Sequence, residues 1–550
     1  EHRAPLFLLF PALVLVSIWT MPDSHVLQLQ FADYTLTPVT TDALSRVFGT
    51  IFGIIAFIGG IYSFHMKELG QQTSALAYAG GAIGVTFAGD WFTFLIFWEL
   101  MAVSSTYLIW ASRTKEAKNA GIRYLVYHSL GGGLLLGGIV WHVLATGSLE
   151  IASLPEVFTA SNVLILIGIA INTALPPLHS WLPDAYPRAT ITGAVFMSAF
   201  TTKSAVYALI RVFPGWELLL WMGVIMALYG VIYAIIANDI REILSYHIIS
   251  QVGFMVAGVG VGTELALNGS AAHAFSHILY KALLFMGAGG VLYSTGQSKL
   301  SELGGLASRM KLTLVLYMIG AFSISGLPLF NGFISKSMVI SGAGDAHFDW
   351  AMLLLLMASV GTFLSVGLKL PYLTWFGRPK EDSAPLTVTP LPKNMTLAMM
   401  LASFLCILFG IYPQLLYAYL PYPVDYHPYT AYHLVESVQY LSFTFIGFWL
   451  LRHKFKRERH ITLDMDWFYR RPAPAVNYLF VTVPDMIFGW FEDTSWAVSQ
   501  YLAGAFRKPA QWINPFTSKS TPSTTYSPET GLVLGLVLLS IIVAGLFLMI

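Results

Sequence analysis

The sequence predicts an all-α, polytopic membrane protein with about 14–15 transmembrane helices and a C-terminal extension. Two observations indicate this fold class. Only 11% of the 550 residues are charged and 56% are hydrophobic, whereas roughly 25% of an ordinary soluble domain is charged. Apolar stretches of the roughly twenty residues that cross a hydrocarbon core recur from one end of the chain to the other. Together with a mean hydropathy of +0.66, they exclude a soluble enzyme.

The charge balance and the cysteine content exclude further classes of protein. The net charge is +1, so the chain lacks the basic excess that neutralises nucleic-acid phosphates. Its single cysteine, Cys406, excludes disulfide frameworks and cysteine-based zinc, haem or iron–sulfur sites. The glycine run 131–133 lies inside an apolar stretch and indicates close helix packing rather than a nucleotide loop. We therefore expect no cofactor, and any redox centre would lie on a partner.

Fifteen stretches are predicted to cross the membrane. In chain order they are 5–20, 45–63, 73–89, 91–110, 122–145, 161–178, 190–213, 217–237, 242–262, 270–293, 312–333, 349–376, 394–420, 436–452 and 531–550. They suggest five regions, which are 1–70, 71–213, 214–376, 377–452 and 453–550. Because the chain begins at Glu1 without a methionine, we expect that an N-terminal piece precedes this numbering.

The loops between these stretches predict the orientation of the chain, because short cytoplasmic loops collect lysine and arginine. Loops after the even-numbered stretches carry the basic residues, whereas the loops 146–160, 263–269 and 421–435 after odd-numbered stretches carry almost none. The even loops are therefore expected in the cytoplasm, with the last stretch ending outside. Their basic residues are Lys67, Arg113, Lys115, Lys118, Arg188, Arg241, Lys299, Arg309, Lys311, Arg378, Lys380, Lys393, Lys454, Lys456, Arg457 and Arg459.

Residues 453–530 depart from this pattern. A charged run over 453–460 is followed by mixed aromatic and polar sequence, for which we expect an interfacial helix over about 480–507. A cytoplasmic loop with some helix is the alternative. The stretch 518–527 is rich in Ser, Thr and Pro and is expected to be a linker.

A few ionisable residues lie inside the predicted spans, where a charge costs roughly 2.5–3.5 kcal/mol on insertion scales and marks a functional candidate. Glu99 lies in the middle of 91–110 and is predicted to take up and release a proton. Lys203 lies near the middle of 190–213 and is its candidate partner. A static ion pair between two helices is the alternative for Glu99, and snorkelling along a tilted helix is the alternative for Lys203.

Three further residues share one helix face. His273, His277 and Lys281 are spaced at i, i+4 and i+8, so they stack over roughly two turns. This spacing favours a proton relay through intervening water. Structural hydrogen bonding and a metal site are the alternatives, although no acidic residue lies nearby in sequence as a third ligand.

Two predicted spans are interrupted by helix-breaking residues. Gly326, Pro328 and Gly332 precede Lys336, and a run of prolines interrupts 175–184. Such backbone is tolerated at membrane depth where it is buried in protein or lines a cavity, so the two breaks suggest an internal repeat that handles ions at each break. Either break could also be an ordinary helix end. Secondary candidates for proton translocation are His128, His179, Asp184, His247 and Lys369.

These residues lie in a set of motifs that resembles a known family. The motifs are FWELM at 97–101, PLHSWLPDA at 177–185, TK at 202–203, HILYKALLF at 277–285 and SGLPLFNGFISK at 325–336. Over about 45–380 the chain resembles the antiporter-like subunits shared by respiratory complex I and Mrp-type cation/proton antiporters, most closely the D-type subunit of Mrp antiporters. The resemblance implies two inverted five-helix repeats, two broken helices and a hydrophilic axis at mid-membrane.

The resemblance also implies roles for individual residues. Glu99 matches the family's carboxylate, Lys203 its central lysine and Lys336 the lysine of the second broken helix, while the middle relay corresponds to His273, His277 and Lys281. One position departs, because Asn172 stands where the family usually has a lysine, so Glu99 lacks its expected partner. The family has one more N-terminal helix than we identify, and 453–550 resembles the lateral-helix extension of its longer members.

The sequence thus predicts an ion-translocating subunit of a larger membrane assembly, in a bacterial or archaeal cytoplasmic membrane. It would move protons together with other membrane subunits and has no catalytic centre of its own; exchange for Na⁺ is left open. Two alternatives remain. One is a structural or adaptor subunit, which Asn172 favours. The other is a membrane partner that exchanges protons with a soluble enzyme, such as one handling inorganic carbon.

Overall fold

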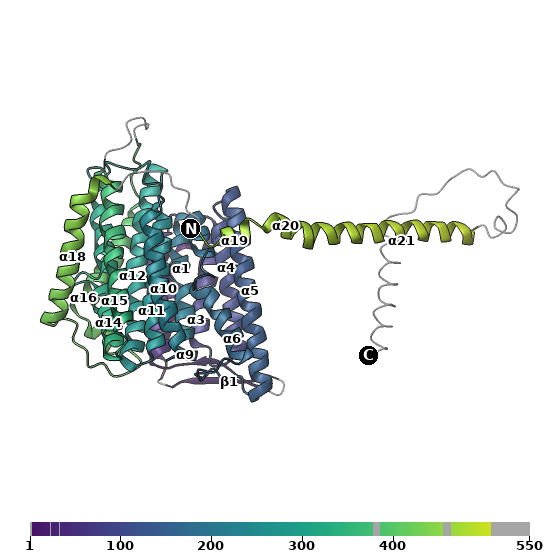
Figure 1. The fold of residues 1–550 in the computed structure, drawn as a ribbon, viewed down its shortest axis with the longest axis horizontal. Helices are drawn as coiled ribbons and strands as arrows, with labels where there is room; N and C mark the ends of the chain where they lie inside the picture. Colours follow the sequence, from purple (N-terminus) through teal and green to yellow (C-terminus); the bar gives the residue numbers. More distant parts are fainter. Residues whose placement is uncertain (1–2, 23, 32–33, 378–385, 455–463, 508–550) are drawn as a thin grey trace. The chain divides into compact units, whose positions relative to one another are not determined.

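A computed structural model describes residues 3–22, 24–31, 34–377, 386–454 and 464–507 (Figure 1). The chain divides into two compact units, Glu1–Thr462 and Leu463–Ile550. The first half of the first unit contains α1 (Arg3–Thr20), β1 (Val26–Phe31), β2 (Tyr34–Thr40), α2 (Ala43–Tyr62), α3 (Leu69–Phe87), α4 (Trp91–Trp110), α5 (Lys115–Thr146), α6 (Ala160–Thr173), α7 (Trp181–Ala185), η1 (Tyr186–Arg188), α8 (Ile191–Met197) and α9 (Thr201–Val212).

The remainder of the first unit is also helical. It contains α10 (Glu217–Ile236), α11 (Ile240–Val261), α12 (Glu264–Thr295), α13 (Lys311–Ser325), α14 (Asn331–Asp345), α15 (Asp349–Thr362), the π-helical η2 (Phe363–Lys369) and η3 (Tyr372–Phe376), α16 (Lys393–Ile411), α17 (Gln414–Tyr417), α18 (Ala431–Leu451) and η4 (Arg452–Lys454). These helices lie side by side in a bundle (Figure 1).

The polytopic membrane architecture is confirmed. Within the described residues, ten helices are long and apolar enough to cross a membrane, and Phe7–Thr20, Ala160–Thr173 and Lys311–Ser325 are shorter apolar helices. Each predicted stretch from 5–20 to 436–452 falls on one helix or on two or three successive helices. The predicted span 531–550 and the predicted linker 518–527 lie outside the described residues.

One short element was not predicted. The strands β1 and β2 form an antiparallel hairpin in which Val26 lies opposite Thr40 and Phe31 lies opposite Tyr34, a small addition to the all-α architecture. A two-stranded hairpin is marginally stable alone. This one is held by Asp90, whose carboxylate accepts a hydrogen bond from the Thr37 backbone N–H at 2.7 Å.

Both predicted interruptions are real breaks. The helix α6 ends at Thr173 and the chain becomes helical again at Trp181 in α7, while α13 ends at Ser325 and α14 begins at Asn331. Gly326 caps α13 with φ +74°, a left-handed conformation that favours glycine. The predicted span 312–333 therefore covers a break. The predicted span 190–213 also consists of two helices, because α8 ends at Met197 and α9 begins at Thr201.

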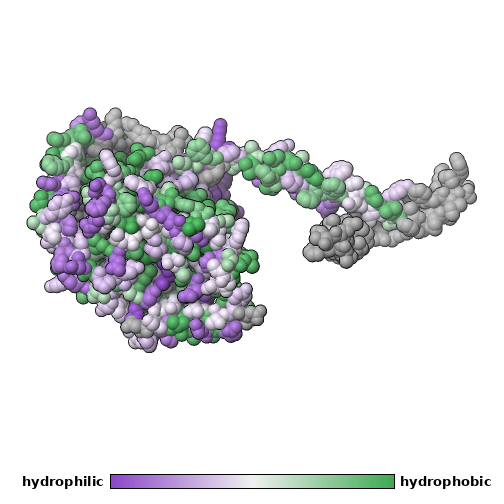
Figure 2. All heavy atoms as spheres, turned by 60° about the horizontal axis from the view of Figure 1, so that its bottom comes forward, coloured by the Kyte–Doolittle hydropathy of each residue, from purple (hydrophilic) through white to green (hydrophobic). Residues whose placement is uncertain are grey.

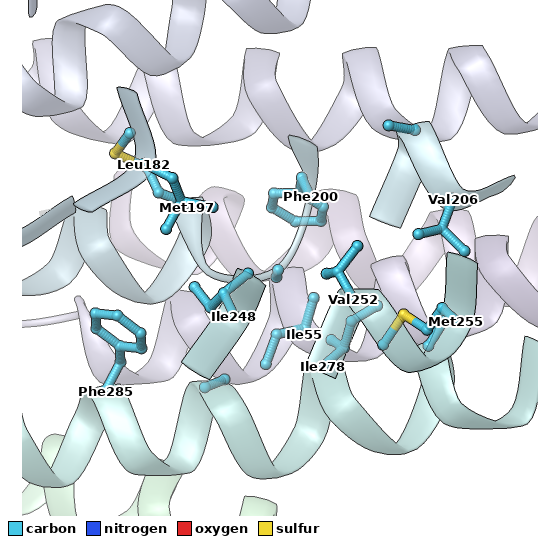
Figure 3. Packing of buried hydrophobic residues seen from close by; sticks show 14 of the residues in the cluster. Ile55, Leu182, Met197, Phe200, Val206, Ile248, Val252, Met255, Ile278 and Phe285 are labelled. Carbon is cyan, nitrogen blue, oxygen red and sulfur yellow. The ribbon is translucent and has the colours of Figure 1, made fainter. Parts of the chain in front are cut away.

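The interior of the first unit is closely packed. Apolar side chains from α2, α7, α8, α9, α11 and α12 meet in one cluster, in which Figure 3 labels Ile55, Leu182, Met197, Val206, Val252 and Ile278. Glycines bring neighbouring backbones together, as the glycine run in α5 predicted. A Cβ atom on Gly168 of α6 would lie 2.9 Å from the Gly131 carbonyl oxygen of α5. Small residues at such positions are typical of helix packing in membranes.

The second unit is described over 464–507. It contains α19 (Trp467–Arg470), α20 (Ala473–Asn477), the π-helical η5 (Tyr478–Thr482) and α21 (Val483–Arg507). The helix expected over about 480–507 is therefore present. It exposes large hydrophobic side chains (Figure 2), which include Met486, Ile487, Phe488, Trp490 and Phe491.

Candidate proton-translocation axis

Lys203 lies just after the break between α8 and α9. Its side chain is fully buried, and Nζ donates hydrogen bonds to the Ser198 carbonyl oxygen at 2.6 Å and to Thr202 Oγ1 at 3.0 Å. Helix ends leave carbonyl groups without intrahelical partners. The break therefore supplies the acceptor that holds a lysine ammonium inside an apolar core.

His273, His277 and Lys281 are all fully buried on α12, as their spacing predicted. The ring centres of His273 and His277 are 6.3 Å apart. Both ring nitrogens of His277 and Nζ of Lys281 have no hydrogen-bond partner among the described residues. Buried polar groups are normally satisfied by protein or by ordered water, so these atoms mark a polar row inside the apolar core.

Lys336 follows the second break, at the start of α14. Its side chain is 2% exposed, and Nζ donates a hydrogen bond to the Ile324 carbonyl oxygen at 2.8 Å. The same Nζ lies 4.9 Å from the centre of the Phe254 ring, a cation–π geometry. Its neighbour Ser335 connects α14 to the row on α12, because Ser335 Oγ lies 3.0 Å from Nδ1 of His273.

These groups are close enough to influence one another's charge. His277 interacts electrostatically with Lys203 on α9 and with Lys281 on its own helix, and Lys203 also interacts with Lys281. His273 interacts with Lys336 and with Lys203. The structure thus brings Lys203, the three α12 residues and Lys336 into one electrostatically coupled group.

His247 and Lys369 extend this group toward the π-helical segment η2. Nε2 of His247 is hydrogen-bonded to Oγ of Ser365, and His247 interacts with the charges of Lys281, Lys336 and Lys369. Nζ of Lys369 donates hydrogen bonds to the carbonyl oxygens of Ile235 and Ala237 at the end of α10. Both secondary candidates therefore lie beside the row.

Several polar residues of this region were not identified from the sequence. The Tyr280 hydroxyl lies 3.4 Å from Nε2 of His273 and 3.4 Å from Oε1 of Gln251. Gln251 Nε2 donates to Thr362 Oγ1 at 3.3 Å. Of these residues, only Gln251 left a signal in the sequence, because a glutamine is unusual inside an apolar span. Serine, threonine and tyrosine are common in such spans and do not stand out.

Glu99 lies apart from this group. It is partly buried on α4, and a Cβ atom on Gly132 of α5 would overlap its Oε1. Neither Glu99 nor Lys203 forms an ion pair within the part of the chain that the structure describes. The expected Glu99–Lys203 pair is therefore absent, because the carboxylate faces α5 while the ammonium turns to Ser198.

The side chain of Asn172 forms a hydrogen bond with a histidine and not the ion pair with Glu99 that a lysine at this position would form. Its Oδ1 accepts a hydrogen bond from Nδ1 of His128 at 2.7 Å, and both residues are buried. The His128 ring packs against Trp181, with ring centres 4.6 Å apart. His128 lies one helical turn before Gly132 on α5, so the Glu99 carboxylate lies about 6 Å further along that helix. His128 and Asn172 therefore form a buried hydrogen-bonded pair, and Glu99 approaches the same helix one turn away, at Gly132.

Asp184 and His179 lie at the first broken helix. The Asp184 carboxylate accepts two hydrogen bonds from Arg123 of α5, at 2.7 and 3.0 Å, and forms an ion pair with Arg188 at 2.7 Å. This arrangement clamps α5 to the second part of the broken helix. The His179 ring packs edge-on against Tyr229 of α10, with ring centres 4.6 Å apart.

Metal-ligand chemistry receives no support within the described ranges. They contain no group of three or more His, Cys, Asp or Glu side chains arranged to hold a metal ion. The pair His273 and His277 therefore has no third ligand of these types among the described residues.

The fold and the site define a multi-pass membrane protein with a buried row of ionisable groups beside helix breaks. The chain belongs to the transmembrane family of NADH:quinone oxidoreductases and Mrp antiporters, because the model of the family "NADH:quinone oxidoreductase/Mrp antiporter, TM" matches residues 88–365, slightly more than half of the chain.

Individual proteins agree with this assignment. An uncharacterized protein of Methanocaldococcus jannaschii is 30% identical over 354 residues, which are 61% of this chain and 73% of that protein. The D-type subunit of the Na(+)/H(+) antiporter of Bacillus subtilis is 28% identical over 369 residues, which are 62% of this chain and 73% of that protein. A chain in the structure of the Mrp complex from Dietzia sp. DQ12-45-1b has the same fold, with a TM-score of 0.66, 22% identity and coverage of 81% of this chain and 92% of that chain.

Proposed function

We propose that this chain is a proton-translocating subunit of a multisubunit membrane complex. One observation carries the proposal: Lys203, His277, Lys281, His273 and Lys336 are all buried in one apolar core, near enough for their charges to interact. The family assignment supports it, because the family description names both quinone oxidoreductases and antiporters.

The row suits stepwise proton transfer. Each of the two end lysines, Lys203 and Lys336, donates to a carbonyl oxygen next to a helix break, and the imidazoles of His273 and His277 lie between them. Interacting ionisable groups titrate as a set, so a proton gained at one lysine makes protonation of its neighbours less favourable. A proton that enters near Lys203 would therefore promote release from Lys336.

The transported ion along this row is the proton. A cation such as Na⁺ requires oxygen ligands, and the row consists of amines and imidazoles that repel a metal cation when protonated. Exchange of these protons for Na⁺, which the name of the Bacillus subtilis relative suggests, would then use a separate route. Glu99, whose carboxylate lies against Gly132 of α5, is a group that would serve such a route.

A structural or adaptor role is the second candidate. The observation that favours it is the bond between His128 and Asn172, which occupies the position where a lysine partner for Glu99 was expected. Under this reading the chain would hold its partners in place, and its buried ionisable residues would carry no net proton current.

Proton and Na⁺ flux in proteoliposomes that contain the intact complex distinguishes the two candidates. A positioned proton-transfer group typically contributes about 100-fold or more to a rate, so Lys203→Ala should lower proton flux by roughly that factor. Lys311→Ala, which removes an exposed lysine at the start of α13, is the matched control and should leave flux unchanged. Glu99→Gln tests the role of the carboxylate on α4, which lies apart from the row. Unchanged flux in Lys203→Ala would contradict the proposal, and unchanged flux in Glu99→Gln as well would favour the adaptor role.

A further inference from the structure

A narrow crevice of about 50 Å³ lies between α14, α15 and α18 and reaches the row at Lys336. One wall is a face of α14 formed by Lys336, Ser337 and Ser341. The opposite wall is a face of α18 formed by His433, Glu436 and Tyr440. Because residues spaced at i, i+3 and i+7 share one helix face, the three α18 side chains point the same way, into the crevice.

Glu436 and His433 belong to none of the motifs that define the family resemblance. Glu436 is the single charged residue of α18 and is half-buried, with Oε1 3.5 Å from the Tyr432 hydroxyl. Nε2 of His433 lies 3.4 Å from Oγ of Ser341, and its Nδ1 is buried without a partner among the described residues. An ionisable residue that is half-buried at the edge of a membrane span is a functional candidate, because burying its charge costs free energy.

Lys336 lies between this crevice and the other residues of the buried row. Its Nζ points inward to the Ile324 carbonyl oxygen, whereas its stem lines the crevice, with Cδ 3.8 Å from the place where a Cβ atom on Gly326 would lie. The absence of a side chain at Gly326 leaves this space open to the Tyr440 hydroxyl. A lysine stem has four flexible carbons, so rotation about its bonds can carry Nζ from the carbonyl into the crevice.

The crevice extends toward the face of the membrane that the loop charges predict to be outside. Lys336 lies nine residues before the end of α14 at Asp345, a rise of roughly 13 Å. Glu436 lies five residues after the start of α18 at Ala431, and the preceding loop 421–435 is one of the predicted outer loops. The polar wall thus connects mid-membrane with the outer end of both helices.

We propose that this crevice is the outer proton exit of the chain and that Glu436, with His433, is its proton-accepting group. The inference rests on the proposed function. The ammonium of Lys336 releases a proton through water in the crevice and becomes a neutral amine, while the Glu436 carboxylate accepts the proton and becomes a neutral acid. Glu436 then releases the proton to the outer solution and regains its charge.

Accessibility of single cysteines tests the crevice independently of transport. Cys406 is the single cysteine of the chain and is buried, so labelling of the native chain gives the background. In the assembled complex in sealed vesicles, Ser341→Cys should react with a membrane-impermeant methanethiosulfonate added on the outer side. Ser359→Cys, on α15 but fully buried outside the crevice, should not react. A Ser341→Cys variant that reacts no faster than Ser359→Cys would overturn the proposal.

Flux measurements test the role of Glu436. Glu436→Gln should lower proton flux at least several-fold, and Glu436→Asp should restore most of it, because a carboxylate of similar reach remains. Glu264→Gln, which removes an exposed carboxylate at the start of α12, should have no effect. Normal flux in Glu436→Gln together with lost flux in Lys336→Ala would reject the exit and leave the proposed function standing. Normal flux in Lys203→Ala as well as in Lys336→Ala would reject the proposed function itself, and with it Glu436 as an exit group, whatever the labelling shows.

Discussion

Lys203 and Lys336 are held by the same local arrangement. Each lies shortly after a helix break and donates a hydrogen bond to a backbone carbonyl at that break, at 2.6 and 2.8 Å respectively. Neither has a carboxylate partner among the described residues, so the charged form is stabilised by a dipole rather than by a counter-ion. A lysine held in this way can lose its proton without leaving a buried, unpaired carboxylate behind, a state that is costly inside proteins.

Asn172→Lys tests what the missing cation means for the first half of the chain. The new ammonium would lie beside His128, one turn of α5 from the Glu99 carboxylate, and should attract it. We expect the proton flux or its pH optimum to change in proteoliposomes. Asn172→Ala is the control, because it removes the acceptor of His128, at a cost of about 1–3 kcal/mol for the unpaired group, without adding charge. Identical flux profiles in the native and Asn172→Lys complexes would show that this position has no influence.

The sequence predicts the charged members of the site but not their polar partners. Lys203, His277 and Lys336 are conspicuous because a charge within an apolar span is expensive. The contacts of Ser335 and Tyr280 with His273 depend on how α12 and α14 meet. Those contacts come from tertiary packing, which hydropathy and spacing within one helix cannot reveal.

At the scale of elements, glycines determine how closely the helices of the axis approach. A Cβ atom on Gly253 of α11 would lie 2.5 Å from the Ala227 backbone nitrogen and 2.6 Å from the Gly223 carbonyl oxygen of α10. Such distances are shorter than any real Cβ contact, so the backbone of α10 would have to move. The helix α11 carries His247 and Gln251, and its position therefore affects the site.

Gly253→Ala should consequently lower stability, despite the better helix propensity of alanine. Overpacking of this kind typically costs about 1–3 kcal/mol, which a thermal melt of the purified complex would detect. Gly133→Ala is the matched control, because Gly133 also lies inside a helix and its Cβ atom would meet no atom within 4 Å. An equal or higher melting temperature for Gly253→Ala than for Gly133→Ala would contradict the close approach.

The broken helices were predictable because proline and glycine leave a clear signal in the sequence. Pro176 and Pro177 cannot donate backbone hydrogen bonds, and Gly326 caps α13 in a left-handed conformation. The break between α8 and α9 has no such residue, since Ser198, Ala199 and Phe200 occupy it. The β1–β2 hairpin was missed for a related reason, because its strands are short and depend on a tertiary anchor at Asp90.

At the scale of the whole molecule, hydropathy alone predicted the multi-pass architecture. The apolar stretches coincide with helices because each must satisfy its backbone hydrogen bonds within the membrane. The way in which the helices assemble around one axis could not be derived from periodicity, since most of them are apolar on all sides. The inverted repeat that the family resemblance implies remains a prediction.

The central claim is that protons cross this chain through one continuous row from Lys203 to Lys336. Proton flux in proteoliposomes with the intact complex, compared among Lys203→Ala, Lys336→Ala and the double variant, tests it directly. Steps in series fail together, so each single variant should lose nearly all flux and the double variant should be no worse, a strongly non-additive result. A single variant with normal flux, or two partial losses that multiply in the double variant, would contradict the account.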